Sequence, residues 1–275
     1  MKSSGFDYIR PHSEQEALSL LAAHGSAARI MAGGQSLVAM LNMRLLKPEL
    51  LVDISGIDSL RGIHVHEKWI EISAMTTQSE LLAWPALARE LPLVAKALPW
   101  VGHFQTRNRG TICGSIVHSD PSSEMPLCLA LLAGEVVLRS QRGERSVPAA
   151  RWQVGMLTTA REPDELVTAV RFPRARQGEG FGFQEVARRH GDFAIVALAA
   201  RSSANTTALA VAGVADVPTV CDVGQLTGAE LSEKLHELAW SLGGSDDIHA
   251  SARYRRELIR RLGPLVIEEA RSCRS

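Results

Sequence analysis

The sequence predicts a mixed α+β protein, with two α/β units followed by a small α+β unit. The first 55 residues have the pattern helix, strand, helix and strand, and the section after them alternates short strands with helices. A polar, glycine-containing segment over residues 173–180 then separates these units from the C-terminal part of the chain. Hydrophobic residues make up 45% of the 275-residue chain, which is enough for a sizeable core.

The first unit begins with a helix whose start is marked by Ser13 and Glu16, spaced as in a capping box. Gly25 suits the position that follows the helix. The remaining elements of this unit are, in order, a strand at residues 29–32, the Gly33-Gly34 turn, a helix that opens at Gln35 or Ser36 and ends before Pro48, and a buried strand at residues 50–54.

The second unit mixes strands with helices. Thr77 and Glu80 form another capping box, Pro92 interrupts a helix, and Gly143 marks the turn of a hairpin. The predicted elements are strands at 63–65 and 69–72, helices at 87–98 and 126–132, hairpin strands at 136–138 and 145–147, and a strand at 166–172.

The C-terminal unit has strands near residues 182–187, 194–202 and 207–214, then helices near 230–242 and 252–271. Three strands and two helices make a small α+β domain. We therefore expect one domain over residues 1–175, split near residue 55 into parts 1–55 and 56–175, and a second domain over residues 176–275.

Charge and cysteine content argue against several classes of protein. Thirty Lys and Arg balance thirty Asp and Glu, and this zero net charge argues against a nucleic-acid-binding face. No two of the four cysteines (Cys113, Cys128, Cys221 and Cys273) have Cys-x-x-Cys spacing, so we expect no metal or iron–sulfur centre on this chain. The chain lacks a signal-peptide pattern and any apolar run of the roughly 18 residues of a membrane helix. We expect a cytoplasmic protein without disulfides or membrane insertion.

Two segments rich in glycine and hydroxyl groups are the strongest indication of function. The first, Ala32–Leu37, places the Gly33-Gly34 turn between a strand and a helix, where backbone N–H groups favour an anion. A plain strand–helix turn explains the same pattern equally well. The spacing matches neither the Gly-x-Gly-x-x-Gly fingerprint nor a P-loop.

The second segment, residues 107–126, carries a more specific combination. Its glycines and polar groups include Gly110, Thr111, Gly114, Ser115, His118, Asp120 and Glu124. The two carboxylates suit hydrogen bonds from ribityl or ribose hydroxyls, although Asp120 and Pro121 also fit an ordinary helix start. His118 alone is more often structural than a catalytic base. Two small-residue segments of this kind bring backbone N–H groups close to a diphosphate, so we expect a nucleotide cofactor.

The two segments together resemble the FAD-binding medium subunit of the molybdenum hydroxylases, which include enzymes of the xanthine dehydrogenase and carbon monoxide dehydrogenase type. The resemblance covers essentially the whole chain. It rests on Ala32-Gly-Gly-Gln-Ser-Leu37 with Lys47-Pro48 and Leu51-Val-Asp-Ile54, on Arg107-Asn-Arg-Gly-Thr-Ile-Cys-Gly-Ser115 with His118-Ser-Asp-Pro121 and Glu124-Met-Pro126, and on Glu185-Val-Ala-Arg-Arg-His-Gly-Asp-Phe-Ala194.

The resemblance implies an FAD-binding domain of the vanillyl-alcohol-oxidase (PCMH) type in residues 1–175 and a C-terminal domain of the carbon monoxide dehydrogenase flavoprotein type. The FAD would be non-covalent, with its diphosphate gripped by the two glycine segments and Glu124 near the adenosine part. Phe193 takes the place of a residue near the isoalloxazine ring, although a core phenylalanine fits it equally well. The implied cofactor-binding residues are Ile30, Met31, Ala32, Gly33, Gly34, Gln35, Ser36, Leu37, Gly110, Thr111, Cys113, Gly114, Ser115, His118, Asp120, Glu124, Glu185 and Phe193.

The resemblance also implies an electron-transfer subunit of a heterotrimeric oxidoreductase. A small partner subunit would carry [2Fe–2S] clusters, a large one would carry the molybdopterin cofactor, and the complex would be a dimer of heterotrimers. FAD would pass electrons from the clusters to an external acceptor, which requires no catalytic acid or base on this chain.

Two alternatives remain, namely a stand-alone flavin oxidase of the same fold and an FAD-free structural subunit. The short C-terminal domain argues against the oxidase. The intact glycines Gly33, Gly34 and Gly114 and the hydroxyl of Ser115 argue against the structural subunit.

Two positions depart from the family pattern. Cys113 stands where relatives often have glycine, and packing is the expected role of its thiol. Glu185 stands where relatives often have lysine. A lysine could stabilise negative charge on reduced flavin, whereas a glutamate cannot, so this substitution puts an electrostatic role at position 185 in doubt.

Overall fold

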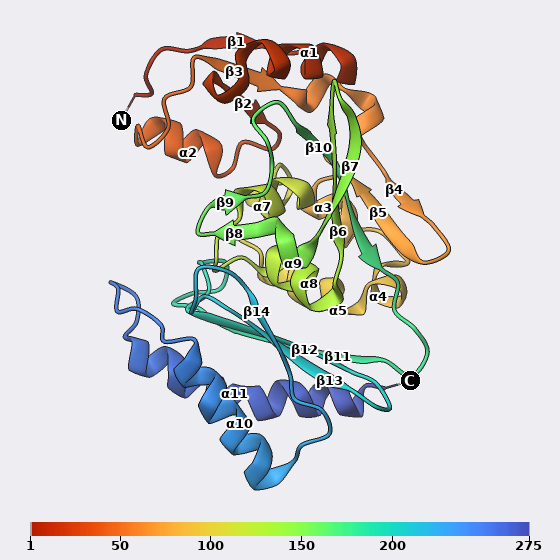
Figure 1. Cartoon of the computed structure of the whole chain (residues 1–275), viewed down its shortest axis with the longest axis vertical. Helices are drawn as coiled ribbons and strands as arrows, with labels where there is room; N and C mark the ends of the chain where they lie inside the picture. Colours follow the sequence, from red (N-terminus) through yellow and green to blue (C-terminus); the bar gives the residue numbers. More distant parts are fainter. Residues whose placement is uncertain (1, 275) are drawn as a thin grey trace.

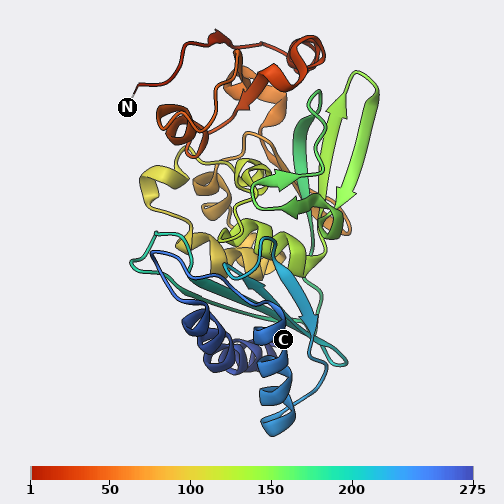
Figure 2. The same ribbon diagram turned by 60° about the vertical axis from the view of Figure 1, so that its left-hand side comes forward.

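The computed structural model describes residues 2–274 and arranges them in three units stacked along the long axis of the molecule (Figure 1). The N-terminal unit lies at one end and the C-terminal unit at the other. A second view shows the same order (Figure 2). The middle unit therefore contacts both neighbours and shares its core with them.

The N-terminal unit is a three-stranded parallel sheet with the strand order β1-β3-β2. The predicted helices and strands are confirmed. The structure adds β1, a short strand of mostly exposed residues that the sequence pattern does not predict. The elements are β1 (Asp7–Ile9), α1 (Glu14–His24), β2 (Ala28–Met31), α2 (Leu37–Asn42) and β3 (Leu50–Asp53), with short 3₁₀ helices at Gly25–Ala27, Ile54–Gly56 and Asp58–Leu60.

The capping box at the start of α1 is only half formed. The Ser13 hydroxyl accepts a hydrogen bond from the N–H of Glu16 at 3.2 Å, as predicted. The Glu16 carboxylate instead accepts from the N–H of His12 at 2.8 Å. In helix α3 (Gln78–Leu82) of the middle unit, by contrast, both halves of the capping box between Thr77 and Glu80 are present.

The middle unit is built on a five-stranded antiparallel sheet with the order β4-β5-β10-β6-β7. Its strands are β4 (Ile63–Val65), β5 (Trp69–Ser73), β6 (Glu135–Ser140), β7 (Gly143–Pro148) and β10 (Leu166–Pro173), beside the small hairpin β8 (Gln153–Gly155) and β9 (Thr158–Thr159). Its helices are α3 (Gln78–Leu82), α4 (Leu87–Glu90), α5 (Pro92–Ala97), α6 (Phe104–Arg107), α7 (Ile112–His118), α8 (Glu124–Leu132) and α9 (Ala149–Trp152), with a 3₁₀ helix at Leu98–Trp100. Every predicted element of this unit is present, and Pro92 does separate α4 from α5.

The glycine- and hydroxyl-rich residues 111–115 form the start of helix α7. Thr111 is its N-cap. The alternative that Asp120 and Pro121 start a helix is wrong, because α8 begins at Glu124 after Ser123. The Asp120 carboxylate instead accepts a hydrogen bond from the N–H of Ser122 at 2.8 Å and stabilises the turn between the helices.

The C-terminal unit is a four-stranded antiparallel sheet, β11-β12-β13-β14, so the prediction of three strands was one too few. The fourth strand follows Pro218 and alternates between half-buried and exposed residues at the edge of the sheet. The elements are β11 (Gly180–Val186), β12 (Val196–Ser202), β13 (Thr207–Ala212), β14 (Thr219–Asp222), α10 (Gly228–Ser241) and α11 (Ala252–Ser272). Residues 174–179 connect β10 to β11, within the polar segment expected at this point.

The two faces of the C-terminal sheet pack against different partners. Ala197 and Ala199 of β12 and Ala210 of β13 belong to the core of the middle unit, and α8 contacts both strands. Leu198 and Leu209 face a second core that includes α10 and α11. Small alanines thus allow α8 to approach the sheet closely, which fixes the C-terminal unit against the middle one.

Within residues 2–274, no helix is both long and apolar enough to cross a lipid bilayer.

Enlarging the alanine face should separate the sheet from α8. Because Ala199 is fully buried, we expect Ala199→Leu to lower the free energy of unfolding by about 1–3 kcal/mol. Val220→Leu, at a 45% exposed position of the edge strand, is the control and should change it by less than about 0.5 kcal/mol. Urea unfolding measures both, and equal midpoints for the two variants would contradict this packing.

Candidate functional site

A cavity of about 690 Å³ lies where the three units meet, within the range of roughly 300–1,000 Å³ that small-molecule sites occupy. The N-terminal unit contributes the segment from Ile30 to Leu37, apart from Met31. The middle unit contributes α7 with Thr111, and the C-terminal unit contributes residues 191–193. No single unit therefore forms the site.

The two glycine segments touch each other through their backbones. A Cβ atom at Gly33 would overlap the carbonyl oxygen of Arg109 and lie 2.9 Å from the Cα of Gly110. Any side chain at position 33 would therefore push the segments apart. Gly34 follows with φ of +71°, a conformation that residues other than glycine rarely adopt.

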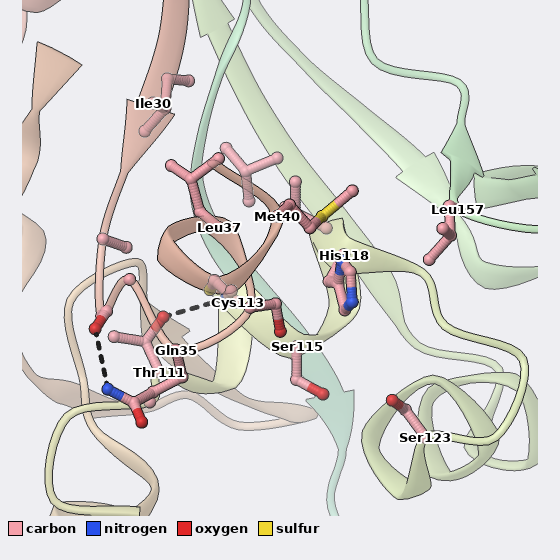
Figure 3. A pocket seen from close by; sticks show the side chains of 18 of the residues that line it. Ile30, Gln35, Leu37, Met40, Thr111, Cys113, Ser115, His118, Ser123 and Leu157 are labelled. Carbon is pink, nitrogen blue, oxygen red and sulfur yellow. Dashed lines mark hydrogen bonds between the residues drawn. The ribbon is translucent and has the colours of Figure 1, made fainter. Parts of the chain in front are cut away.

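A row of backbone donors follows this contact, in residues that line the cavity. Within the described residues 2–274, the N–H groups of Gly34, Gln35 and Ser36 have no hydrogen-bond acceptor in the protein. The Gln35 side chain folds back onto the carbonyl of Gly33 at 3.4 Å (Figure 3). Successive free N–H groups form a concave site that suits an anion such as a diphosphate.

The first turn of α7 lies beside this row. The Thr111 hydroxyl accepts a hydrogen bond from the N–H of Gly114 at 2.9 Å, which holds the turn together (Figure 3). A Cβ at Gly114 would lie 2.7 Å from that hydroxyl oxygen and would disturb the cap. Figure 3 shows Ser115 and His118 on the same helix, and both line the cavity.

Two arginines, which the sequence analysis did not single out, line another part of the cavity. Arg29 comes from β2, and Arg161 follows β9. Burial and the neighbouring Arg29 lower the pKa of Arg161, whose Nη1 donates to the carbonyls of Glu162, Pro163 and Glu165. Within residues 2–274 neither guanidinium is in an ion pair, so this part of the cavity also favours a negatively charged ligand.

The β8–β9 hairpin forms a wall of the cavity. The carbonyl of Ser119, at the end of α7, accepts from the N–H of Leu157 at 3.1 Å and from the side chain of Gln153 at 2.9 Å. Leu157 and His118 both line the cavity (Figure 3). Burial lowers the pKa of His118 from its ordinary value, so its imidazole is neutral at pH 7.

The loop between β11 and β12 brings Phe193 to the cavity. His190 stacks on Trp100 of the middle unit with 5.2 Å between ring centroids, and a Cβ at Gly191 would lie 2.7 Å from the ring of His103. These contacts dock the loop on the middle unit. Phe193 lines the cavity and is 67% exposed, so the alternative of a core phenylalanine is wrong.

Two acidic residues are buried, one in the cavity lining and one outside it. Glu124 lines the cavity and is 6% exposed, and burial with the nearby charge of Asp120 raises its pKa to about 7. Glu185 is 7% exposed but does not line the cavity, and burial with the charge of Glu124 raises its pKa to about 9. The Glu185 carboxyl group is therefore neutral at pH 7.

The thiol of Cys113 packs in the core, as expected. Its Sγ lies 3.4 Å from the carbonyl oxygen of Ile72, and burial raises the pKa of the thiol far above its ordinary value. Such a thiol is protonated and unreactive. Cys113 is nevertheless one of the residues that line the cavity.

The structure brings most of the candidate residues to this one cavity and leaves three outside its lining. Met31 lines a neighbouring cavity of about 490 Å³ on the other side of the Gly33-Gly34 turn, together with Asp53 and Arg109. Asp120, which precedes α8, and Glu185, on β11, are not in the lining. Lining residues that the motifs did not indicate include Arg29, Ile54, Leu157, Thr159, Arg161 and Val167.

Sequence comparison assigns this architecture to a known family. Residues 4–175 match the family described as the FAD binding domain in molybdopterin dehydrogenase. The chain is 36% identical to the nicotine 6-hydroxylase medium subunit of Paenarthrobacter nicotinovorans, with 98% of this chain and 99% of the relative covered. This chain belongs to the FAD-binding medium subunits of the molybdenum hydroxylases. It is thus a subunit of an oxidoreductase.

Other members of the family are similar over almost their whole length. The glyceraldehyde dehydrogenase medium chain of Sulfolobus acidocaldarius is 34% identical, with 96% of this chain and 98% of the relative covered. The solved carbon monoxide dehydrogenase of Hydrogenophaga pseudoflava superimposes with a TM-score of 0.94 at 30% identity, over the full length of both chains. The fold described above is therefore that of the medium subunits.

The close contact at Gly33 should be intolerant of any side chain. We expect Gly33→Ala to lower the free energy of unfolding by roughly 2–4 kcal/mol, because the new methyl group overlaps backbone atoms. Gly5→Ala is the matched control, since a Cβ there meets no atom within 4 Å. Thermal unfolding of both variants measures the difference, and a Gly33→Ala variant as stable as the control would contradict the contact.

Proposed function

We propose that the cavity at the junction of the three units is the FAD site of this medium subunit. The observation that carries the proposal is the row of free N–H groups at residues 34–36 beside the first turn of α7. A diphosphate fits this row, and the Gly33 contact keeps it open. Arg29 and Arg161 would then offset the negative charge of the cofactor. The proposed binding is non-covalent, so no side chain of this chain would form a bond to the flavin.

The division of the chain follows from the same proposal. Residues 1–175 would form the FAD-binding domain of the PCMH type, with parts 1–55 and 56–175 on either side of the cofactor. Residues 176–275 would form the C-terminal domain, whose loop carries Phe193 to the flavin end. The extent of the family match, residues 4–175, supports this boundary.

The proposed partners are a small iron–sulfur subunit and a large molybdopterin subunit, assembled as a dimer of heterotrimers. The names of the relatives, which call them medium subunits or medium chains, support such an assembly over a stand-alone oxidase or an FAD-free subunit. Bound FAD would supply a carrier that accepts electrons from the [2Fe–2S] clusters and donates them to an external acceptor. This chain would hold the flavin within electron-transfer distance and exclude water from it.

The substrate would be selected outside this chain. The relatives are named for nicotine, glyceraldehyde and carbon monoxide, which share no chemical group, although their medium chains align with this chain over nearly its whole length. We therefore propose that the large subunit binds the substrate and that the medium subunit serves the same purpose in each complex.

Releasable FAD is the expected result of purification. The chain, expressed with its partner subunits, should show the visible absorption of oxidised flavin and should release FAD into the supernatant on acid precipitation. A colourless complex that stays colourless after addition of FAD would contradict the proposed function. Colour retained in the acid precipitate would contradict non-covalent binding.

The flavin content of purified variants tests the position of the site. Thr111→Val removes the cap of α7, so we expect a loss of about 1 kcal/mol of stability and about tenfold weaker FAD binding. Ser251→Ala is the control, because the Ser251 hydroxyl caps α11 by accepting from the N–H of Tyr254 at 3.2 Å and Ser251 is not part of the cavity lining. Equal flavin content in both variants would argue against this position of the diphosphate.

Phe193 should affect the flavin more than the fold. Because its side chain is 67% exposed, Phe193→Ala should change the free energy of unfolding by less than about 0.5 kcal/mol. It should shift the visible spectrum and the midpoint potential of the flavin. Phe104→Ala is the control, since Phe104 is 62% exposed and is not part of the cavity lining. An unchanged spectrum and midpoint potential would show that Phe193 does not lie beside the isoalloxazine ring.

A further inference from the structure

Two buried carboxyl groups, those of Glu124 and Glu185, lie on elements of the contact between the C-terminal sheet and the middle unit. Glu185 alternates along β11 with Phe181 and Phe183, so the three side chains share one face of the strand. Both phenylalanines belong to the core of the middle unit, and α5 contacts β11 on this side. Glu124, the first residue of α8, approaches from the middle unit. The pair therefore belongs to the contact that positions the Phe193 loop.

The Glu185 carboxyl group has no partner in this contact. Within residues 2–274, neither of its oxygens forms a hydrogen bond, and neither Glu185 nor Glu124 is in an ion pair. The one cation of α5, Lys96, is bound by Glu269 of α11 at 2.5 Å. No group of three metal-binding side chains occurs among the described residues, so the pair is no metal site there.

The surrounding titratable groups supply no positive charge that would compensate an ionised Glu124 or Glu185. His118 of α7 is neutral, and Asp120 adds a further negative charge near Glu124. Arg189 in the loop after β11 pairs with Asp192, and Arg201 of β12 pairs with Glu179. The remaining titratable groups of this loop are Arg188 and His190, of which His190 stacks on Trp100.

Burial and mutual repulsion therefore keep a proton on the pair. Desolvation opposes the ionisation of each carboxyl group, and a negative charge on one disfavours ionisation of the other. Burial raises the pKa of Glu185 to about 9 and that of Glu124 to about 7, and the charge of Glu124 adds to the shift of Glu185. The proton thus resides on Glu185, the member farther from the cavity.

We propose that Glu124 and Glu185 make FAD binding proton-linked, so that the cofactor is held tightly only while Glu185 carries its proton. This inference rests on the FAD site proposed above. Glu124 lines the cavity that would receive a dianionic diphosphate, and each lost proton adds a negative charge to that wall. An ionised Glu185 would also be an unpaired charge in the contact that docks the Phe193 loop. Both effects weaken binding as the pH rises.

Calorimetric titration of the FAD-depleted complex with FAD tests the linkage. We expect about fourfold weaker binding at pH ~9.5 than at pH ~7, because a pKa of about 9 leaves roughly a quarter of the Glu185 carboxyl groups protonated at the higher pH. Titrations in buffers of different ionisation enthalpy should show net proton uptake on binding. In Glu185→Gln, whose side chain stays neutral, the FAD affinity should fall much less over this pH range. Glu135→Gln, which removes an exposed carboxyl group from β6, should behave like the wild type. Proton release on binding, or the same decline in Glu185→Gln as in the wild type, would overturn the proposal.

The stability of the protein tests the buried proton without FAD. A carboxyl group whose pKa is raised by folding binds its proton more tightly in the folded state, so its burial costs stability progressively as the pH rises above the unfolded value of about 4.3. Glu185→Gln removes this cost. The variant should therefore unfold at higher urea concentration than the wild type at pH ~8, and the advantage should vanish near pH ~4.5. Equal urea midpoints of Glu185→Gln and the wild type at pH ~8 would overturn the inference that folded Glu185 holds a proton.

The two measurements fail in different ways. A complex that binds no FAD at any pH would overturn the FAD site and, with it, the linkage. The urea experiment would still decide whether Glu185 holds a proton. Normal FAD binding with a flat pH profile would leave the FAD site intact and overturn only the linkage.

Discussion

The contact between Gly33 and the backbone of Arg109 and Gly110 is the constraint on which the site depends. It joins the N-terminal unit to the middle unit without any intervening side chain. The chain turns immediately after this contact, and residues 34–36, whose N–H groups have no acceptor among the described residues, line the cavity. The start of α7, only a few residues beyond Gly110, is held beside them for the same reason. A cofactor bridging the two segments would strengthen a contact that the protein already makes.

Local patterns in the sequence predicted most elements, whereas their arrangement depended on tertiary contacts. Capping residues and glycines located α1, α3 and the Gly33-Gly34 turn, because caps act within a few residues. The strands β1 and β14 escaped prediction because pairing with a neighbouring strand, and not their own composition, makes them strands. In their short sequences, apolar and polar residues do not clearly alternate.

The site shows the same division between local and distant effects. Glycine motifs indicated the row of N–H groups, but nothing near Arg29 or Arg161 in the sequence marks them as neighbours. They meet at the cavity because β2 and the β9–β10 connection lie side by side in the fold. The resemblance includes Glu185 among the cofactor-binding residues, while its departure from lysine puts an electrostatic role in doubt. Burial of Glu185 makes the neutral acid the relevant form, and only the structure reveals that burial.

The contribution of the C-terminal sheet to the cavity has a consequence for biosynthesis. Residues 30–37 and 111–118 leave the ribosome well before the β11–β12 loop that carries Phe193. That loop can dock only after β11 and β12 have paired, and the alanine face of β12 needs α8 already in place. Cofactor loading would therefore come late in the life of the nascent chain. Until then, an unfinished chain would expose the apolar face of its middle unit to the chaperones of the cell.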